Sequence, residues 1–192
     1  MPDPILFVAG FGRCGTTMMM NMLDQGGFPV AGPRPAFEVA QMVPGRVDLD
    51  WVHAQAGKAV KWIDPLNARI RRNDLPVAPV IIHMGRDFGE MARSQVKLLG
   101  SLVTDSRNTR RAFKKDIEAK APKLAATLNA TGSVYHMTFE WVLHETEAAA
   151  QKLAGIIATE FGRVFDARTA ATVPLQRSPL CAPDLSIEEA MI

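Results

Sequence analysis

Short apolar runs alternate with amphipathic stretches along this chain, and the alternation predicts an α/β fold. Strands are expected at residues 5–9, 58–63, 77–84 and 133–137, and the apolar runs at 5–9 and 77–84 are typical of buried strands. Helices are expected at residues 16–25, 36–42, 48–56, 65–71, 88–102, 108–129 and 146–161. Strands that alternate with helices favour a parallel sheet with right-handed crossovers. We therefore predict a three-layer sandwich, in which helices flank a central, mostly parallel β-sheet.

Glycine and proline residues mark the boundaries of several predicted elements. Gly26 and Gly27 predict the end of the first helix. Pro65 is suited to the first position of a helix, where its missing N–H group has no partner to lose. Pro122 falls inside the charged stretch at residues 108–129, and it should break or kink that helix.

Composition agrees with one globular domain. The chain has 192 residues, of which 47% are hydrophobic and 22% are charged, so it can form a substantial core. No linker, repeat or low-complexity tract divides it, and we expect a single domain over residues 1–192. The last part, residues 167–192, is weakly patterned, and we assign no function to it.

Net charge, cysteine content and the lack of long apolar runs bear on the expected partners and localisation of the protein. The net charge of +2 neither favours nor excludes a polyanionic partner, and the basic residues from Arg107 to Lys115 either attract anions or form an exposed helix face. Cys14 and Cys181 match no metal-ligand spacing, so no metal site is expected. The chain has no apolar run near the ~20 residues that span a bilayer, and its N-terminus lacks the basic start of a signal peptide. We expect a cytoplasmic protein without membrane or nucleic-acid partners; a homo-oligomer stays open.

The first predicted strand leads through a glycine-rich octet, GFGRCGTT from Gly10 to Thr17, into the first helix. This order favours an anion-binding loop, because backbone N–H groups and the helix N-terminus can surround an anion. The usual nucleoside-triphosphate loop has a lysine after its second glycine, whereas Thr16 stands there in this chain. Arg13 is the only cation of the octet, which suits a shorter anion such as a phosphosulfate. Cys14 lies where a helix N-terminus can lower the pKa of a thiol.

A second anion site is predicted where the third strand ends. Arg86 follows that strand, and Ser94 comes eight positions later, about two helical turns into the next helix. A guanidinium and a hydroxyl in these places could hold one phosphate from two sides. The alternative is that Arg86 pairs with Asp87 or another carboxylate and that Ser94 is a packing residue.

The two motifs, GFGRCGTT and RDFGEMARS, together resemble the cytosolic-type sulfotransferase family. In that family the first motif holds the 5′-phosphosulfate of 3′-phosphoadenosine-5′-phosphosulfate (PAPS), and the second holds its 3′-phosphate. A third stretch, HMTFEWVLHETEAAAQKLAGII, is similar to a late family segment through Phe139 and Glu140. The ordered agreement runs from residue 5 to about residue 160. The resemblance implies a P-loop-type sandwich that transfers a sulfuryl group from PAPS to a hydroxyl group, with 3′,5′-ADP as the other product and no required metal.

The resemblance also implies roles for individual residues. The expected donor-binding residues are Gly12, Arg13, Cys14, Gly15, Thr16, Thr17, Arg86 and Ser94. Arg13 would also stabilise the charge of the leaving group. Glu38 is the first candidate for the general base, because some bacterial carbohydrate sulfotransferases have a glutamate in a similar G-R-P-x-E context; its alternative role is a helix cap. Asp64 is the second candidate, and Lys61 is expected to touch the sulfuryl group unless it is only a lysine at a sheet edge.

Departures from the family pattern leave other functions open. Phe88 replaces the usual proline of the second motif, and Arg177 is a weak counterpart of the family's C-terminal glycine- and lysine-rich loop. The chain is also short for an enzyme with its own acceptor pocket. One alternative is therefore a P-loop enzyme related to small-molecule or nucleotide kinases, which Thr16 in the lysine place disfavours. The other is a nucleotide-binding module without turnover.

Overall fold

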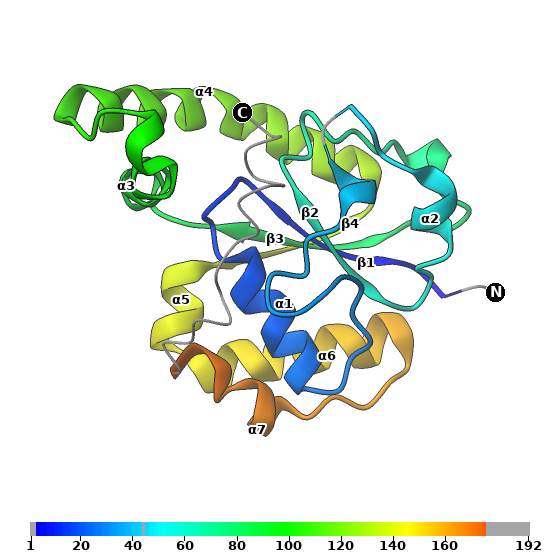
Figure 1. Cartoon of the computed structure of the whole chain (residues 1–192). Helices are drawn as coiled ribbons and strands as arrows, with labels where there is room; N and C mark the ends of the chain where they lie inside the picture. The colour runs from blue at the N-terminus through cyan, green and yellow to red at the C-terminus, as the bar shows by residue number, and fades with distance from the viewer. Residues whose placement is uncertain (1–2, 44, 176–192) are drawn as a thin grey trace.

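Four parallel strands form the centre of the molecule (Figure 1). The computed structural model describes residues 3–43 and 45–175, so Arg177, Cys181 and the rest of the predicted tail beyond residue 175 lie outside the described residues. The strands are β1 (Leu6–Gly10), β2 (Ala59–Ile63), β3 (Val80–Gly85) and β4 (Ser133–Thr138). Their order across the sheet is β2-β1-β3-β4, and every neighbouring pair is parallel. The α/β prediction is confirmed.

Helices cover both faces of the sheet. One face packs against α1 (Thr16–Gln25), α5 (Phe139–His144), α6 (Thr146–Phe161) and α7 (Ala167–Ala170). The other face packs against α2 (Leu49–His53) and the second half of α4 (Arg107–Thr131). Between them, α3 (Phe88–Leu99) leads from the end of β3 towards α4. Figure 1 shows these three layers.

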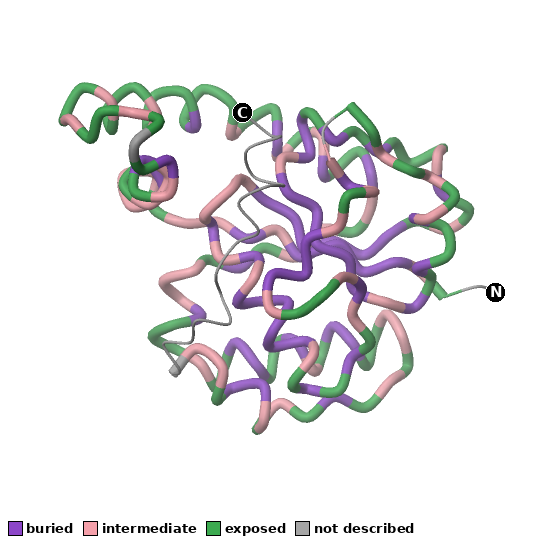
Figure 2. The backbone as a smooth tube through the Cα atoms, viewed as in Figure 1, coloured by how far each residue is buried: buried purple, intermediate pink, exposed green. Residues whose placement is uncertain are grey.

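The two sides of β1 belong to two separate hydrophobic clusters. Leu6 and Val8 pack with the methionine-rich inner face of α1, whereas Phe7 and Ala9 pack on the other side with Trp62 of β2. This alternation follows from the two-residue period of a strand. All five residues of β1 and of β2 are buried, and Figure 2 shows these two strands in the buried centre, whereas β4 at one side of the sheet has only Met137 buried. The continuous apolar runs therefore reflect a sheet that is covered on both faces.

The structure corrects some predicted helices. The helix predicted at residues 65–71 is wrong: this segment forms turns, in which the Trp62 indole N–H donates to the Ala68 carbonyl at 2.6 Å, and only the short 3₁₀ helix η2 (Arg72–Asp74) follows. The helix predicted at residues 36–42 shortens to the 3₁₀ helix η1 (Ala40–Met42), because Phe37 has a left-handed φ of 56° that an α-helix does not allow.

The helices predicted at residues 16–25 and 146–161 are confirmed. The long charged helix is also present, but Pro122 does not break it: α4 continues through the proline for 25 residues. Pro122 is exposed, and the helix is held by Leu124 and Leu128, which are buried against the sheet. Two further 3₁₀ helices, η3 (Gly100–Leu102) and η4 (Val173–Leu175), follow α3 and α7. Among the described residues, no helix is both long and apolar enough to cross a membrane.

Strands β1 and β3 approach each other closely at Gly10. A Cβ atom at Gly10 would lie 2.7 Å from the Met84 carbonyl oxygen and 2.5 Å from the Cys14 sulfur. We predict that Gly10→Ala lowers the free energy of unfolding by about 2–3 kcal/mol, because the backbone of β3 cannot move away without disturbing the sheet. Urea denaturation measures this loss. Gly155→Ala is the matched control: Gly155 lies in the exposed part of α6 with no atom within 4 Å of the added Cβ, and we expect a gain of about 0.5–1 kcal/mol. Equal stability of the two variants would contradict the prediction.

Candidate functional site

The glycine-rich octet forms the loop between β1 and α1, at the carboxyl edge of the sheet. Two of its residues have left-handed backbone angles: φ is 69° at Arg13 and 100° at Gly15. Such residues let successive N–H groups turn towards one point, which is the geometry of an anion-binding nest. A side chain at Gly15 would also collide with Phe139, because its Cβ would lie 2.6 Å from the Phe139 ring. The loop therefore needs glycine at this position for its φ angle and for space.

Arg13, Arg86 and Ser94 meet beside this loop. The Arg13 Nε group donates a hydrogen bond to the Ser94 hydroxyl at 3.0 Å, although the two residues are 81 positions apart. The Arg86 Nη1 group donates to the Arg13 carbonyl oxygen at 3.1 Å across 73 positions. Since β1 and β3 are adjacent parallel strands, the residues that follow them emerge at the same edge. The two predicted anion sites thus form one continuous cluster.

Arg86 has further contacts that orient its guanidinium. Its Cζ atom lies 4.3 Å from the centre of the Phe139 ring, in a cation–π arrangement. The Glu90 carboxylate lies 4.0 Å from its Nη2 group, which is beyond hydrogen-bond distance. Asp87 instead caps α3 by accepting a hydrogen bond from the Glu90 N–H group. Among the described residues, the Arg86 Nε group is buried and has no hydrogen-bond acceptor, so a donor is available for a ligand at this place.

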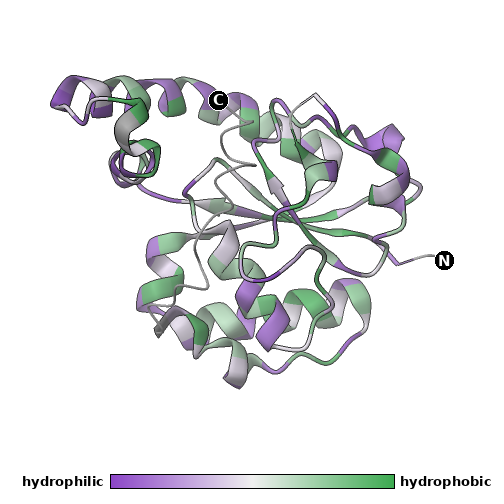
Figure 3. Cartoon of the chain, in the orientation of Figure 1, coloured by the Kyte–Doolittle hydropathy of each residue, from purple (hydrophilic) through white to green (hydrophobic). Residues whose placement is uncertain are grey.

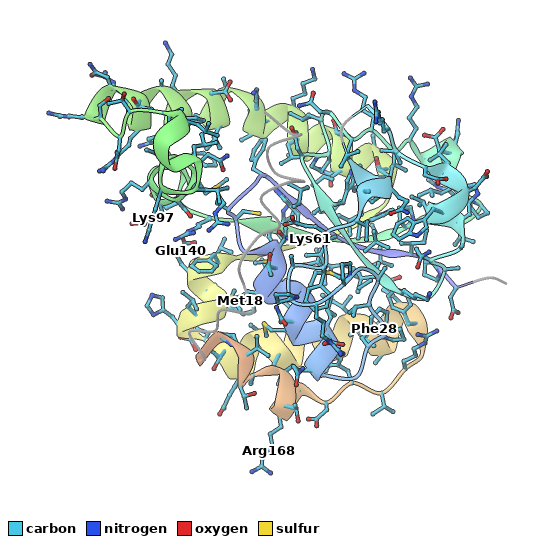
Figure 4. All side chains as sticks on the ribbon, viewed as in Figure 1. Met18, Phe28, Lys61, Lys97, Glu140 and Arg168 are labelled. Carbon is cyan, nitrogen blue, oxygen red and sulfur yellow. The ribbon has the colours of Figure 1, made fainter. Side chains whose placement is uncertain are left out.

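A buried ion pair lies on the other side of the loop. The Lys61 ammonium is 2.5 Å from the Glu38 carboxylate, and both side chains are 2% exposed. The same ammonium donates to the Thr17 hydroxyl at 2.7 Å and to the Ala36 carbonyl oxygen at 3.0 Å. Figure 4 shows Lys61 next to α1, near the middle of the molecule. Although β2 is at one side of the sheet, Lys61 is thus an interior residue that joins the glycine loop to the segment around Glu38.

Asp64 lies at the end of β2, on the same edge of the sheet. Its N–H group donates to the Gly10 carbonyl oxygen at 3.1 Å, and its φ angle is 50°. Its carboxylate accepts a hydrogen bond from the Asn67 side chain at 2.6 Å. A cavity of about 250 Å³ lies beside this corner, lined by Gly45, Val47, Leu49, Asn67 and Arg69. Asn67 thus links the cavity to Asp64, which does not itself line it.

The surroundings of Cys14 contradict the prediction made for its thiol. The side chain is 1% exposed, and burial raises the pKa of the thiol to about 12, against the smaller opposing effects of the Thr16 N–H group and the Lys61 charge. The prediction that the helix N-terminus lowers this pKa is wrong, because desolvation of the thiolate outweighs the helix terminus. The thiol is packed in the core, so Cys14 can meet a ligand only through its backbone.

Three residues near the cluster were missed as site residues by the sequence analysis. Phe139 supports Arg86 and fills the space beside Gly15, and the Glu140 carboxylate accepts the Asp87 N–H group at 3.0 Å. Gln95 faces the loop, since a Cβ at Gly12 would be 3.5 Å from its side-chain oxygen. The third sequence stretch contained Phe139 and Glu140 as a signal, whereas nothing in the sequence marked Gln95.

We compared the chain with known proteins in two ways. Neither a scan against models of protein families nor a search of curated proteins finds a match for the chain.

His83 of β3 forms a pair with His136 of β4 near the same edge. Their Nδ1 atoms are 3.0 Å apart, and their rings are tilted at 71°. Burial, with a smaller contribution from the charge of His136, lowers the pKa of His83 to about 4. His83 is therefore neutral at pH 7 in the folded protein, whereas an unfolded histidine titrates near 6.5.

The depressed pKa of His83 predicts that the protein loses stability as the pH falls. Between about pH 6.5 and pH 4 the unfolded chain binds a proton that the folded protein does not bind, so the free energy of unfolding decreases by up to about 3 kcal/mol across this range. Above pH 6.5 this contribution is fully present. Urea denaturation of wild type and His83→Asn at pH 7 and pH 4.5 measures the difference, and the variant should lose clearly less. His144→Asn, at an exposed position, is the control; a His83→Asn variant with the pH response of wild type would contradict the assignment.

Proposed function

We propose that this chain is a sulfotransferase that moves a sulfuryl group from PAPS to a hydroxyl group of a small molecule or a carbohydrate. The observation that carries the proposal is the convergence of Arg13, Arg86 and Ser94 beside the glycine loop. Two guanidinium groups, a hydroxyl and a helix N-terminus at one edge of a parallel sheet suit a ligand with two separate anionic groups. A nucleotide with phosphates at both its 5′ and 3′ positions has this chemistry.

The donor-binding roles follow from hydrogen-bond chemistry. The loop N–H groups from Gly12 to Thr17 and the Arg13 guanidinium would hold the 5′ end, where negative charge grows as the leaving group departs. Arg86 and Ser94 would hold the 3′-phosphate. The Ser94 hydroxyl accepts from Arg13 and can still donate its own proton to a phosphate oxygen. The unsatisfied Arg86 Nε group adds a further donor.

Lys61 explains how the site can differ from that of a nucleoside-triphosphate enzyme. Thr17 stands at the hydroxyl position that binds Mg²⁺ in the usual phosphate-binding loop. In this chain that hydroxyl accepts a hydrogen bond from the Lys61 ammonium at 2.7 Å. A cation that belongs to the chain thus lies at this hydroxyl. This arrangement supports a phosphosulfate donor over a Mg²⁺-bound triphosphate, and it makes Lys61 part of the positive surroundings of the sulfuryl group.

The transfer step needs a base beside the acceptor. The acceptor oxygen forms a bond to sulfur, the bond from sulfur to the 5′-phosphate oxygen breaks and leaves its electron pair on 3′,5′-ADP, and the hydroxyl proton passes to a carboxylate. Glu38 remains the first candidate; its carboxylate is 2% exposed and paired with the Lys61 ammonium, so the acceptor would have to open this pair to reach it. Asp64 remains the second candidate, because it lies beside the cavity at the end of β2.

Nucleotide titrations test the donor assignment. By calorimetry, we expect 3′,5′-ADP to bind more tightly than 5′-AMP or ATP, because only 3′,5′-ADP fills the place of Arg86 and Ser94. Arg86→Met should weaken 3′,5′-ADP binding by about 10- to 100-fold, the value of a charged hydrogen bond, and leave 5′-AMP binding nearly unchanged. Arg93→Met, at an exposed position seven residues further along, is the control. Tight binding of ATP with no binding of 3′,5′-ADP would reject the proposal in favour of a kinase-like enzyme.

Activity measurements test the base. With PAPS and a panel of hydroxylated acceptors, we expect Glu38→Gln to lower the rate of transfer by about 10²- to 10⁴-fold, because proton removal is lost, while 3′,5′-ADP affinity changes little. Asp64→Asn is the matched variant and should retain most of the rate. A large loss in Asp64→Asn alone would transfer the role to Asp64. Circular dichroism checks that Glu38→Gln is folded, since it leaves the Lys61 charge buried. No transfer to any acceptor, despite binding of 3′,5′-ADP, would indicate a binding module.

A further inference from the structure

The positive charge of this chain is concentrated in one projecting part. Residues 88–131, which form α3, α4 and their connection, contain nine of the 22 lysines and arginines but only four of the 20 acidic residues. This segment therefore has a net charge of +5, while the rest of the chain has −3. Figure 3 shows the outer end of α4 as strongly hydrophilic, in contrast to the strands. The net charge of +2 hides a strong asymmetry.

Three of these cations form a row along α4. Arg107, Arg111 and Lys115 are spaced by four residues, so they lie on one side of the helix over about 12 Å. All three are exposed. Within the described residues none of them has an ion-pair partner, whereas Arg110, Lys114 and Lys120 pair with Asp105, Glu118 and Asp116. We call these three residues the basic row.

Helix stability does not account for the basic row. The first turn of α4 contains no acidic residue, and Arg107 and Arg110 stand at the end where the helix dipole disfavours cations. No residue from 107 to 116 is buried, and Figure 2 shows this end of α4 as the most exposed part of the helix. Like charges four residues apart also repel each other. A ligand with several negative charges would relieve both effects.

The basic row lies on the same side of the molecule as the candidate site. α3 begins directly after β3 and carries Ser94, which contacts Arg13 of the glycine loop. Figure 1 shows the first half of α4 beside α3, beyond the carboxyl ends of β1 and β3. Lys97 of α3, labelled in Figure 4, is another exposed cation in this region. A chain-like ligand on the basic row can therefore extend towards the loop.

We propose that the acceptor is a polyanionic carbohydrate chain, carboxylated or already sulfated, and that Arg107, Arg111 and Lys115 bind it. This inference rests on the proposed function. A polysaccharide of this class carries both repeated anionic groups for the basic row and free hydroxyl groups for transfer. Duplex DNA has free hydroxyl groups only at its ends, and a phosphatidylserine membrane has none, so neither combines the two requirements.

Polygalacturonate and neutral dextran serve as the probes. We expect polygalacturonate to bind in low salt, to lose affinity steeply as salt rises, and to accept sulfate from PAPS, while dextran binds weakly. The triple variant Arg107→Gln, Arg111→Gln and Lys115→Gln should bind polygalacturonate about 10-fold more weakly, with a smaller salt dependence. The control triple variant Arg46→Gln, Lys123→Gln and Arg168→Gln removes the same charge at other exposed positions and should bind almost as wild type.

The outcomes separate this inference from the proposed function. Both triple variants should bind 3′,5′-ADP like wild type; failure of wild type to bind 3′,5′-ADP rejects the proposed function, whatever the polysaccharide does. Equal losses of polygalacturonate affinity in the two triple variants would overturn the role of the basic row. The inference would also be overturned if duplex DNA or phosphatidylserine vesicles bound to the same three residues more tightly than polygalacturonate does. Transfer of sulfate to dextran but not to polygalacturonate would overturn it as well.

Discussion

The ammonium of Lys61 is the group on which the arrangement of this edge of the molecule depends. It joins β2 to the first turn of α1 through Thr17 and to the segment after residue 35 through Ala36 and Glu38. A charge in the interior is tolerated only where its partners are fixed, and loss of one partner leaves an uncompensated charge that costs roughly 3–5 kcal/mol. Phe37, whose backbone is left-handed, lies between two of these partners; its N–H group donates to the Pro33 carbonyl oxygen at 2.8 Å and its side chain is buried.

The parallel sheet explains why the remaining site residues are neighbours. β1 lies between β2 and β3, so the glycine loop has Asp64 on one side and Arg86 on the other. Each of these two residues is the first after its strand, and each contacts a backbone carbonyl oxygen, that of Gly10 or of Arg13. These two hydrogen bonds can therefore persist when a side chain of the loop is substituted, as long as the glycines that the backbone conformation requires are kept. The strand order thus determines which residues are neighbours at this edge of the sheet. The residues that follow each strand determine which chemical groups are present there.

Sequence periodicity was sufficient for the strands and the long helices, because their apolar residues face a core. It failed at residues 65–71, where the hydrogen bond from Trp62 to Ala68 stabilises turns, and at Pro122, where packing of Leu124 and Leu128 outweighs a missing backbone hydrogen bond. Candidate site residues were found because glycine patterns and strand ends are visible in a sequence. The pairing of Lys61 with Glu38 and the thiol pKa of Cys14 were not predictable, since both depend on burial by residues far away in the chain.

Buried and exposed cations act differently in this protein. The net charge of the whole chain therefore does not predict which ligands it attracts. Lys61 acts on its immediate neighbours in the interior, because its charge is enclosed and compensated by Glu38. Arg107, Arg111 and Lys115 are solvated, so each contributes little to folding, but together they produce a field that reaches about one Debye length into solution. In the net charge of +2, acidic residues elsewhere in the chain offset these cations. The position of charge relative to the site, rather than its sum, therefore determines which ligands the protein attracts.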